Sequence, residues 1–280
     1  MAEIHPTAVI ARDVQMGVGN RIGPYVVIEE GVKLGSHNVI HASAYLSRGT
    51  EIGSHNEIHM GAVIGHAPQD LAYKGAPTYT RIGDHNQIRE YVTIHRGTKP
   101  ESATVIGNEN FLMAYCHIAH NCELASQIVM VNQASLTGYC KVEDQAFLSG
   151  MTGFHQFTRI GRLALVSALS VSNKDIPPYM ICGGRPSLVV AINSVGLRRA
   201  GIPPGARNEI KRAYRILYRE GLNIPHALEK MKAELHSAEA GHLIRFVESS
   251  KRGIIGAWRR GVAGDSLLHK KGPSLEEVEG

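Results

Sequence analysis

Large apolar residues recur every six residues along most of the chain. They occupy the positions Ile4, Ile10, Met16, Ile22, Ile28, Leu34, Ile40, Leu46, Ile52, Ile58, Ile64, Ile82, Ile88, Ile94, Ile106, Leu112, Ile118, Leu124, Met130, Leu136, Val142, Leu148, Phe154, Ile160 and Val166. Asp70, Ala76 and Pro100 interrupt the run. A helix has a period of 3.6 and a half-buried strand a period of 2, so neither alone explains a period of six. The pattern predicts a parallel β-helix, in which each hexad forms one flat side of a coil.

A second inward position follows four residues after each large residue. It holds small or medium side chains: Ala8, Val14, Val26, Ala44, Ala62, Val92, Ala134, Ala146 and Ala164. Cys116, Cys122 and Cys140 fall in the same position, so we expect them to be small core residues rather than nucleophiles or metal ligands. Glycine often follows the large residue. Because glycine adopts backbone conformations that other residues resist, we expect such a conformation at these positions.

Two segments, residues 66–81 and 96–105, have a length that keeps the hexad phase but lack its pattern. They are predicted to be loops that leave the solenoid, and long loops on a rigid frame are common places for binding and catalysis.

The hexad repeat ends near Ser172. From Leu188 onward, in LVVAINSVGLRRAG, the pattern predicts a helix. Three further helices are predicted within IPPGARNEIKRAYRILYREG, IPHALEKMKAELHS and EAGHLIRFVESSKRG. We therefore expect a β-helix over 1–186, an α-helical C-terminal domain over 187–262 that covers the end of the solenoid, and a disordered tail over 263–280.

The composition is that of a globular protein, with a net charge of +5. Four cysteines in 280 residues are too few for a disulfide framework, so a reducing compartment is expected. No segment approaches the roughly 20 apolar residues of a membrane span, and the first residues do not resemble a signal peptide. Stable membrane insertion and nucleic-acid binding are not expected.

The fifteen histidines fall into groups. Those at one repeated position, in GSHN, GSHN and GDHN, are interpreted as corner residues: His37, His55 and His85. Five stand apart from any group of chemical interest and are expected to be solvated: His5, His226, His236, His242 and His269. Seven remain for chemistry: His41, His59, His66, His95, His117, His120 and His155.

In CHIAHNC, residues 116–122, the period places His117 and His120 on the outside of the solenoid and both cysteines inside. A zinc site shared by all four is therefore excluded. An outward imidazole is a suitable general base for a hydroxyl group. On periodicity alone, two solvated surface histidines remain the simpler interpretation.

The chain closely resembles the UDP-N-acetylglucosamine O-acyltransferases that begin lipid A synthesis. The resemblance rests on IGHAPQDLAYKGAPTYTRIGDHNQIREYVTIHRGT, FLMAYCHIAHNC, MTGFHQF, NSVGLRRAG, AYRILYREG and RGIIG, and is collinear over about residues 4–255. It implies a left-handed β-helix, a cytoplasmic homotrimer with active sites between subunits, and no cofactor or metal. The implied reaction transfers an (R)-3-hydroxyacyl chain from acyl carrier protein to the glucosamine 3-hydroxyl of UDP-N-acetylglucosamine.

The resemblance also implies roles for single residues. His120 matches the general base, and Gly138 matches the glycine whose N–H stabilises the oxyanion, although a plain corner glycine stays open. Asp70, His95 and His117 match positions around the sugar. The remaining matches are His155 and Gln156 on the acyl and pantetheine path, Asn193 and Arg199 near the nucleotide, and Ala168 where acyl length is measured.

Residues 198–220 contain seven basic side chains and two acidic ones. They could dock the acidic carrier protein or form an ordinary solvated helix face, and the sequence favours neither. Replacing Arg212 and Arg215 by Glu would distinguish the two.

Several positions depart from the family. Asn121 stands where Asp is usual, Tyr139 where His is common, and Ala72 where Lys is common, with Lys74 close by. We hypothesise that these changes favour an acceptor with a 3-amino group in place of the 3-hydroxyl. The methyl group of Ala168, where glycine often accompanies a long chain, predicts a shorter acyl chain.

Three alternatives remain. A related hexapeptide acyltransferase could act on another nucleotide sugar; the N-acyltransferase of the same pathway normally has an extra N-terminal domain, whereas the repeat here starts at Ile4. A zinc carbonic anhydrase of similar fold needs three histidines that meet across a subunit boundary. A β-helix scaffold without activity explains the period but neither the two loops nor the basic helices.

Overall fold

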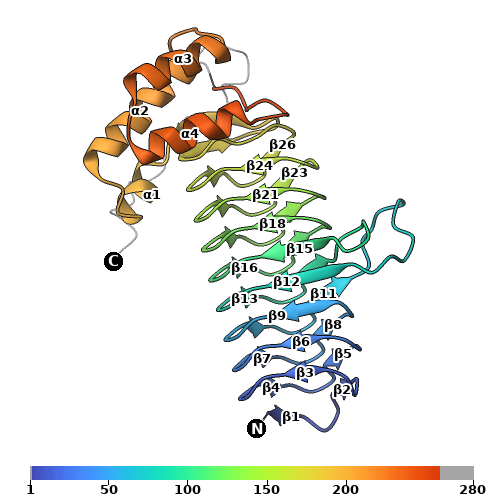
Figure 1. The fold of residues 1–280 in the computed structure, drawn as a ribbon. Coiled ribbons are helices and arrows are strands. Elements are labelled where there is room, and N and C mark those ends of the chain that lie inside the picture. The colour runs from blue at the N-terminus through green and yellow to red at the C-terminus, as the bar shows by residue number, and fades with distance from the viewer. Residues whose placement is uncertain (1, 259–280) are drawn as a thin grey trace.

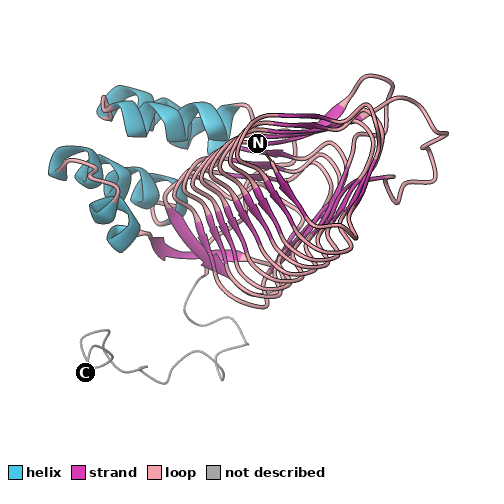
Figure 2. Ribbon diagram, turned by 90° about the horizontal axis from the view of Figure 1, so that it is seen from below, coloured by secondary structure: helices cyan, strands magenta, loops and turns pink. Residues whose placement is uncertain are grey.

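The protein, a computed structural model in which residues 2–258 are described, is a left-handed parallel β-helix followed by four helices (Figure 1). The tail predicted for 263–280 lies outside the described residues. Three sheets form the sides of a triangular prism, which is seen end-on in Figure 2. Within residues 2–258, no helix is long and apolar enough to cross a membrane.

The three sheets are named A, B and C in the order in which the chain visits them. Sheet A contains β1 (Glu3–Ile4), β4 (Arg21–Ile22), β7 (Val39–Ile40), β10 (Glu57–Ile58), β13 (Gln87–Ile88), β16 (Phe111–Leu112), β19 (Val129–Met130), β22 (Phe147–Leu148), β25 (Leu165–Val166), β27 (Met180–Gly183) and β28 (Leu188–Ile192). Sheet B contains β2 (Val9–Ile10), β5 (Val27–Ile28), β8 (Tyr45–Leu46), β11 (Val63–His66), β14 (Thr93–His95), β17 (His117–Ile118), β20 (Ser135–Leu136), β23 (Gly153–Phe154) and β26 (Val171–Ser172). Sheet C contains β3 (Gln15–Met16), β6 (Lys33–Leu34), β9 (Thr50–Ile52), β12 (Tyr79–Ile82), β15 (Ala103–Ile106), β18 (Glu123–Leu124), β21 (Lys141–Val142) and β24 (Arg159–Ile160).

The large residue of each hexad points into the prism and ends its strand in most coils; β11 and β14 continue past Ile64 and Ile94. Neighbouring coils pair in register, for example Ile58 with Ile40 and with Ile88, so these side chains stack along the axis. The second inward position is buried as predicted, apart from partly buried Ala8 and Val14 near the open N-terminal end. All four cysteines are buried and unpaired.

The glycines that follow the large residue serve mainly for space, which corrects the expectation from backbone freedom. A Cβ on Gly35 would lie 2.6 Å from the carbonyl carbon of Gly53 in the next coil. The left-handed backbone occurs instead at the corners, where His37, His55 and His85 have φ of 60°, 60° and 58°. Their rings stack in a column, with centroids 5.1 and 4.8 Å apart. They are corner residues, as the sequence indicated.

A ladder of buried asparagines follows this corner. The side-chain oxygen of Asn38 accepts from the backbone N–H of Asn56, and the oxygen of Asn56 accepts in the same way from Asn86, at 2.9 Å in both cases. Asn20 and Asn110 continue the ladder. Each buried amide is thereby hydrogen-bonded, as stability requires, and the coils are held in register.

Two excursions leave the prism, both at the corner between sheets B and C. Residues 67–78 connect β11 to β12, and residues 96–102 connect β14 to β15, each inside the range expected from the sequence. Figures 1 and 2 show them projecting from one edge of the solenoid.

The expectation of a helix from Leu188 is wrong in its first part. Residues Leu188–Ile192 form β28, which pairs antiparallel with β27 and ends sheet A. Its β-branched side chains favour a strand, and Val189 is fully buried against the solenoid end. The helices are α1 (Ser194–Arg199), α2 (Pro204–Tyr218), α3 (Ile224–Glu234) and α4 (Ala238–Glu248).

Helix α4 is tied to the last coils by polar contacts. Arg159 of β24 donates to the carboxylate of Asp175 at 2.8 Å and to the carbonyl of Phe246 at 2.7 Å, and its guanidinium lies 4.2 Å from the centre of the Phe246 ring. His242 of α4 lies 2.9 Å from the Tyr179 hydroxyl and 3.0 Å from a Glu143 oxygen. His242 is therefore a packing residue between helix and solenoid rather than a solvated one.

Candidate functional site

Three of the predicted residues form a column along the corner between sheets B and C. His120, Gly138 and Gln156 each lie two residues after the inward residue of their strand in sheet B, and those inward residues pair in register. Successive members of the column are therefore separated by one strand spacing, about 4.8 Å. Both excursions leave the solenoid at the same corner.

His120 is buried, with 4% of its surface exposed, which corrects the expectation of a surface imidazole. The excursion places Asp70 beside it, with Oδ2 of Asp70 3.4 Å from Nε2 of His120. The Tyr139 ring packs edge-on against the imidazole, with centroids 5.3 Å apart. The hexad period gives the direction of His120 but contains no information on what the excursions cover.

Asp70 is held by its own loop. Its Oδ1 accepts from the backbone N–H of Ala72 at 2.8 Å, and its carbonyl accepts from the N–H of Tyr73 at 3.0 Å. These contacts leave Oδ2 directed at His120.

Asn121 orients the other side of the imidazole. Its Oδ1 lies 3.1 Å from Nδ1 of His120 and accepts from the backbone N–H and hydroxyl of Thr98 at 3.0 and 2.9 Å. Because Oδ1 acts as an acceptor in this network, we assign the ring proton to Nδ1. The lone pair of His120 is then on Nε2, on the side of Asp70.

Gly138 leaves room for the imidazole. A Cβ at this position would lie 2.4 Å from Cε1 and 2.5 Å from Nε2 of His120, closer than any real contact. The backbone N–H of Gly138 has no acceptor within residues 2–258. It is therefore free to donate to a ligand beside the imidazole.

His95 of β14 and His117 of β17 lie close together on neighbouring coils, and His117 is on the same coil as His120. Their rings meet edge-on with centroids 4.9 Å apart. Nδ1 of His117 lies 2.7 Å from the Thr93 hydroxyl, whereas Nδ1 of His95 is buried and has no partner among the described residues. Burial is the main cause that lowers the pKa of both, to about 4 for His95, and nearby histidines lower both further.

His155 and Gln156 are exposed on the next coil above Gly138, and Nδ1 of His155 lies 3.2 Å from the Gln156 carbonyl. The rings of Tyr139 and Phe157 stack with centroids 4.8 Å apart beside them. This part of the column therefore presents aromatic rings and polar side chains next to each other on the outside.

The other predicted residues lie elsewhere in the chain. Ala168 is exposed at the corner between sheets A and B, and Arg199 is exposed on α1. Asn193 caps α1 by accepting from the N–H of Gly196, and its amide donates to the Leu163 carbonyl, so both ends of its side chain are engaged. Within residues 2–258, no hydrogen bond or ion pair joins these three residues to the His120 column.

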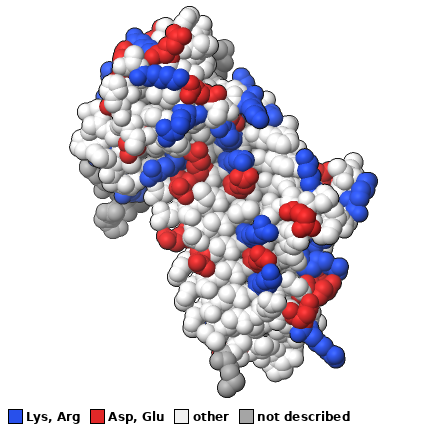
Figure 3. Space-filling view, in the orientation of Figure 1, with Lys and Arg blue, Asp and Glu red and all other residues white. Residues whose placement is uncertain are grey.

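The basic stretch 198–220 is partly neutralised. Arg212 forms ion pairs with Glu220 and Glu234. Lys211 and Arg215 are exposed and have no ion pair within residues 2–258. Figure 3 shows acidic and basic side chains interspersed over the visible side of this part.

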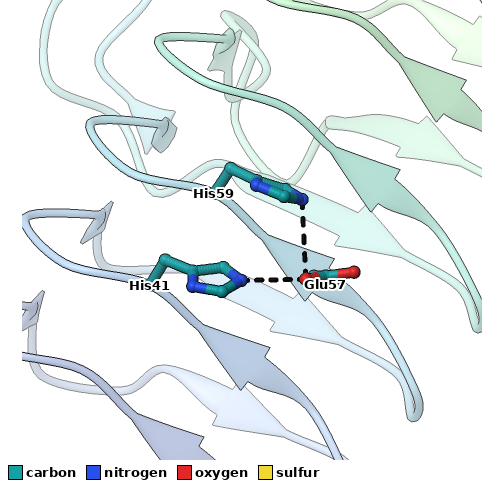
Figure 4. A group of neighbouring side chains, drawn as sticks. All are labelled: His41, Glu57 and His59. Carbon is teal, nitrogen blue, oxygen red and sulfur yellow. Dashed lines mark hydrogen bonds and ion pairs between the residues drawn. The ribbon is translucent and has the colours of Figure 1, made fainter.

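One group was not singled out from the sequence. His41, Glu57 and His59 converge on the outside of sheet A (Figure 4). The signal was available, because His41 and His59 are 18 residues apart, which is three hexads, and 18 residues complete one coil.

The sequence is similar to curated acyltransferases over almost its whole length. It is 46% identical over 257 residues to the acyl-[acyl-carrier-protein]–UDP-N-acetylglucosamine O-acyltransferase of Myxococcus xanthus, covering 91% of this chain and 99% of that protein. It is 42% identical to the protein of the same name from Thiobacillus denitrificans, covering 91% and 100%. The family model described as "Udp N-acetylglucosamine O-acyltransferase; Domain 2" matches residues 175–255.

Solved structures agree. A UDP-N-acetylglucosamine acyltransferase from Bacteroides fragilis superposes with a TM-score of 0.88 at 40% identity, covering 90% of this chain and 99% of that one. An Arabidopsis UDP-N-acetylglucosamine acyltransferase gives a TM-score of 0.82 at 31% identity, covering 90% and 99%. The similarity covers about nine tenths of this chain and almost all of each relative, and the chain belongs to the acyl-[acyl-carrier-protein]–UDP-N-acetylglucosamine O-acyltransferase family.

Proposed function

We propose that this protein transfers an (R)-3-hydroxyacyl chain from acyl carrier protein to the 3-position of the glucosamine ring of UDP-N-acetylglucosamine, the first step of lipid A biosynthesis. The observation that carries the proposal is the environment of His120. Its imidazole is buried, oriented at Nδ1 by Asn121 and flanked at Nε2 by Asp70. A general base requires such an oriented lone pair.

The reaction needs one proton to move twice. Nε2 of His120 takes the proton from the acceptor hydroxyl as its oxygen attacks the thioester carbonyl, forming the new C–O bond. Collapse of the tetrahedral intermediate breaks the C–S bond, and the proton on Nε2 passes to the leaving thiolate. Asp70, 3.4 Å from Nε2, stabilises the transient imidazolium. It thus supplies the negative charge that Asn121 lacks.

The Gly138 N–H is our candidate for oxyanion stabilisation. It lies in the same column as His120, one strand spacing away, and has no acceptor in the described part of the chain. A preorganised donor next to the base can stabilise the negative oxygen of the intermediate. Gln156 continues the column by one coil, where it could meet the donor acyl group.

A homotrimer with sites between subunits is part of the proposal, and the outer faces of the sheets support it. Sheet C carries charged outward residues in ion pairs, such as Lys33 with Glu51 at 2.9 Å and Lys141 with Glu123 at 2.8 Å. The outward faces of sheets A and B contain more apolar residues than that of sheet C, although Glu3, Arg21, Glu57 and Gln87 also face outward from sheet A. The apolar outward residues are Val39, Phe111, Val129, Phe147 and Leu165 in A and Val9, Val27, Tyr45, Val63 and Val171 in B. Apolar faces of this kind mark protein contacts.

The predicted site residues lie in two separate places on the chain, and this separation also supports a trimer. His120, Gly138 and Gln156 are at the corner between sheets B and C, whereas Ala168 lies between sheets A and B and Arg199 lies on α1. Contact between sheet B of one copy and sheet A of the next would bring the two sets together. Arg199 would then meet phosphate oxygens, which a guanidinium binds well.

We further propose that the protein acts in the cytoplasm, where carrier protein is made and where its four buried, unpaired cysteines remain reduced.

The test is an acyl-transfer assay with purified protein, 3-hydroxyacyl carrier proteins of several chain lengths, and acceptors with a 3-hydroxyl or a 3-amino group. We expect product, and we expect His120→Ala to lower kcat by about 10²- to 10⁴-fold. The matched control is His55→Ala, a corner histidine outside the column. No product from any pair, or full activity of His120→Ala, would reject the proposal.

The same assay addresses the acceptor. An amine is a better nucleophile than a hydroxyl, so a site with Asn121 in place of Asp is expected to favour the 3-amino sugar. Equal turnover, or preference for the hydroxyl, would reject the amine preference and leave the acyltransferase proposal in place.

A further inference from the structure

His41 and His59 lie one above the other on the outside of sheet A. Each follows the inward residue of its strand, and those residues, Ile40 and Ile58, pair in register. The two imidazoles stack with centroids 4.8 Å apart and an angle of 27° between their planes. Glu57 precedes Ile58 and also points outward, so that Figure 4 shows both rings directed toward its carboxylate.

The three side chains present their ligand atoms to one point. Oε1 of Glu57 is 2.9 Å from Nε2 of His41 and 3.6 Å from Nε2 of His59. All three ligand atoms lie within 4.8 Å of one another. A tetrahedral ion with bonds of about 2.0–2.1 Å holds its ligand atoms about 3.3 Å apart. The two distances to Oε1 lie on either side of that value, so small side-chain rotations would complete the set.

The outer ring nitrogen of His59 also has a partner. Nδ1 of His59 is 3.4 Å from Oε1 of Glu90, which Arg89 holds at 2.9 Å. Histidines that bind metals usually donate their second ring N–H to a carboxylate, which directs the lone pair of the first nitrogen at the ion.

A stacked histidine pair alone is not a site. His37 and His55 stack in the same way, with centroids 5.1 Å apart, but have no carboxylate between them. Among residues 2–258, His41, Glu57 and His59 form the one group of three that brings its ligand atoms together. Their side chains are 37%, 43% and 17% exposed in the single chain, so an ion can reach them there or become enclosed when sheet A meets sheet B of the next copy.

We infer that His41, Glu57 and His59 bind a divalent transition-metal ion of the zinc class, with water at the fourth position. Two imidazoles and one carboxylate favour zinc, cobalt or nickel over magnesium or calcium. The site links neighbouring coils on sheet A, away from the corner where His120 lies, and does not depend on the proposed acyl-transfer reaction. The inference departs from the expectation of a protein without metal, which rested on the resemblance.

The experiment measures zinc binding to the full-length, metal-stripped protein by calorimetry, and zinc content by mass spectrometry after dialysis. The ligand variants are His41→Ala, His59→Ala and the nearly isosteric Glu57→Gln. Glu90→Gln is expected to weaken binding by about 10- to 100-fold, as changes of such supporting carboxylates do. His55→Ala is the matched control, and His120→Ala tests whether the histidines of the column bind zinc instead.

We expect one zinc ion per chain in the wild type and both controls, and loss of that ion in the three ligand variants. A wild type that takes up no stoichiometric zinc would overturn the inference. So would undiminished binding in Glu57→Gln and the histidine variants, or loss of the ion only in His120→Ala. Circular dichroism checks that each variant is folded. If a histidine variant is unfolded, zinc binding to Glu57→Gln decides the test.

Discussion

A methyl group at position 138 would lie 2.4 Å from Cε1 of His120. The glycine is therefore required by the side chain of the coil below it, whatever its backbone N–H does. Gly138→Ala is expected to displace the imidazole and to lower kcat/KM by about 10²-fold or more, because small misplacements of a catalytic group have effects of this size.

The control for Gly138→Ala is Gly150→Ala, at the same repeat position in sheet A. A Cβ on Gly150 would lie 3.3 Å from its nearest neighbour, the Asn132 carbonyl, so a small shift accommodates it. Comparable activity in the two variants would show that the contact between residues 138 and 120 does not matter.

Asp70 and Asn121 flank opposite nitrogens of His120. This predicts that a carboxylate at either position can stabilise the imidazolium, so that one can compensate for loss of the other. Asp70→Asn keeps an acceptor for the Ala72 N–H but removes the charge beside Nε2, and kcat should fall by about tenfold or more. Asn121→Asp supplies a carboxylate beside Nδ1 and should restore part of the loss in the double variant. The four proteins form a double-mutant cycle, and strictly additive effects on kcat would refute the compensation.

The pKa of His95, lowered to about 4 mainly by burial, predicts a pH-dependent stability. Between pH 6.5 and 4 the unfolded chain binds a proton at this residue and the folded chain does not, so the free energy of unfolding falls as the pH falls. The expected loss is about 3 kcal/mol. Denaturant unfolding from pH 7 to pH 4 measures it, and His95→Asn should flatten this part of the curve. An equally steep fall in the variant would assign the effect to other groups.

Docking of carrier protein on α2 is better tested on Lys211 and Arg215 than on Arg212, which forms ion pairs with Glu220 and Glu234. Lys211→Glu with Arg215→Glu should raise KM for the acyl carrier protein donor and leave kcat near its original value. A short acyl-pantetheine donor, which has no carrier protein, serves as the control substrate. An unchanged KM for the carrier-protein donor would show that α2 presents an ordinary solvated face.

The exposed methyl of Ala168 predicts the length of the preferred acyl chain. Ala168→Gly should shift the ratio of kcat/KM toward donors that are longer than the one the wild type prefers. Chain-length profiles of the two proteins, measured with the same set of carrier-protein donors, provide the check. Identical profiles would place the end of the acyl chain elsewhere.

The sequence predicts the solenoid well because one local rule, a large apolar residue at every sixth position, acts in each coil. It also places Cys116, Cys122 and Cys140, since the inward positions are part of that rule, whereas Cys182 lies beyond the repeat. It misses β28, because Leu188–Ile192 can form either a strand or the first turn of a helix, and the choice depends on the open edge of sheet A. It misses the burial of His120, because the covering residues come from excursions that have no repeat.

The length of one coil predicts further contacts between side chains. Residues 18 positions apart are neighbours wherever no excursion intervenes, which is how His120 meets Gly138 and His41 meets His59. The carboxylate of Glu57 completes the second pair only because residues on either side of the inward Ile58 both face outward.

The excursion that carries Asp70 leaves the solenoid after β11 and returns at β12. These strands pair in parallel with the coils above and below, with one register shift between Ile64 and His66 where the excursion begins. The ladder therefore places no demand on what the excursion contains. The imidazole of His120 and the N–H of Gly138 are parts of the repeating solenoid. The negative charge beside Nε2 comes from Asp70 on the excursion, a segment that can be replaced without changing the solenoid. A new loop at this edge could change the accepted sugar while the proton-transfer machinery is inherited intact.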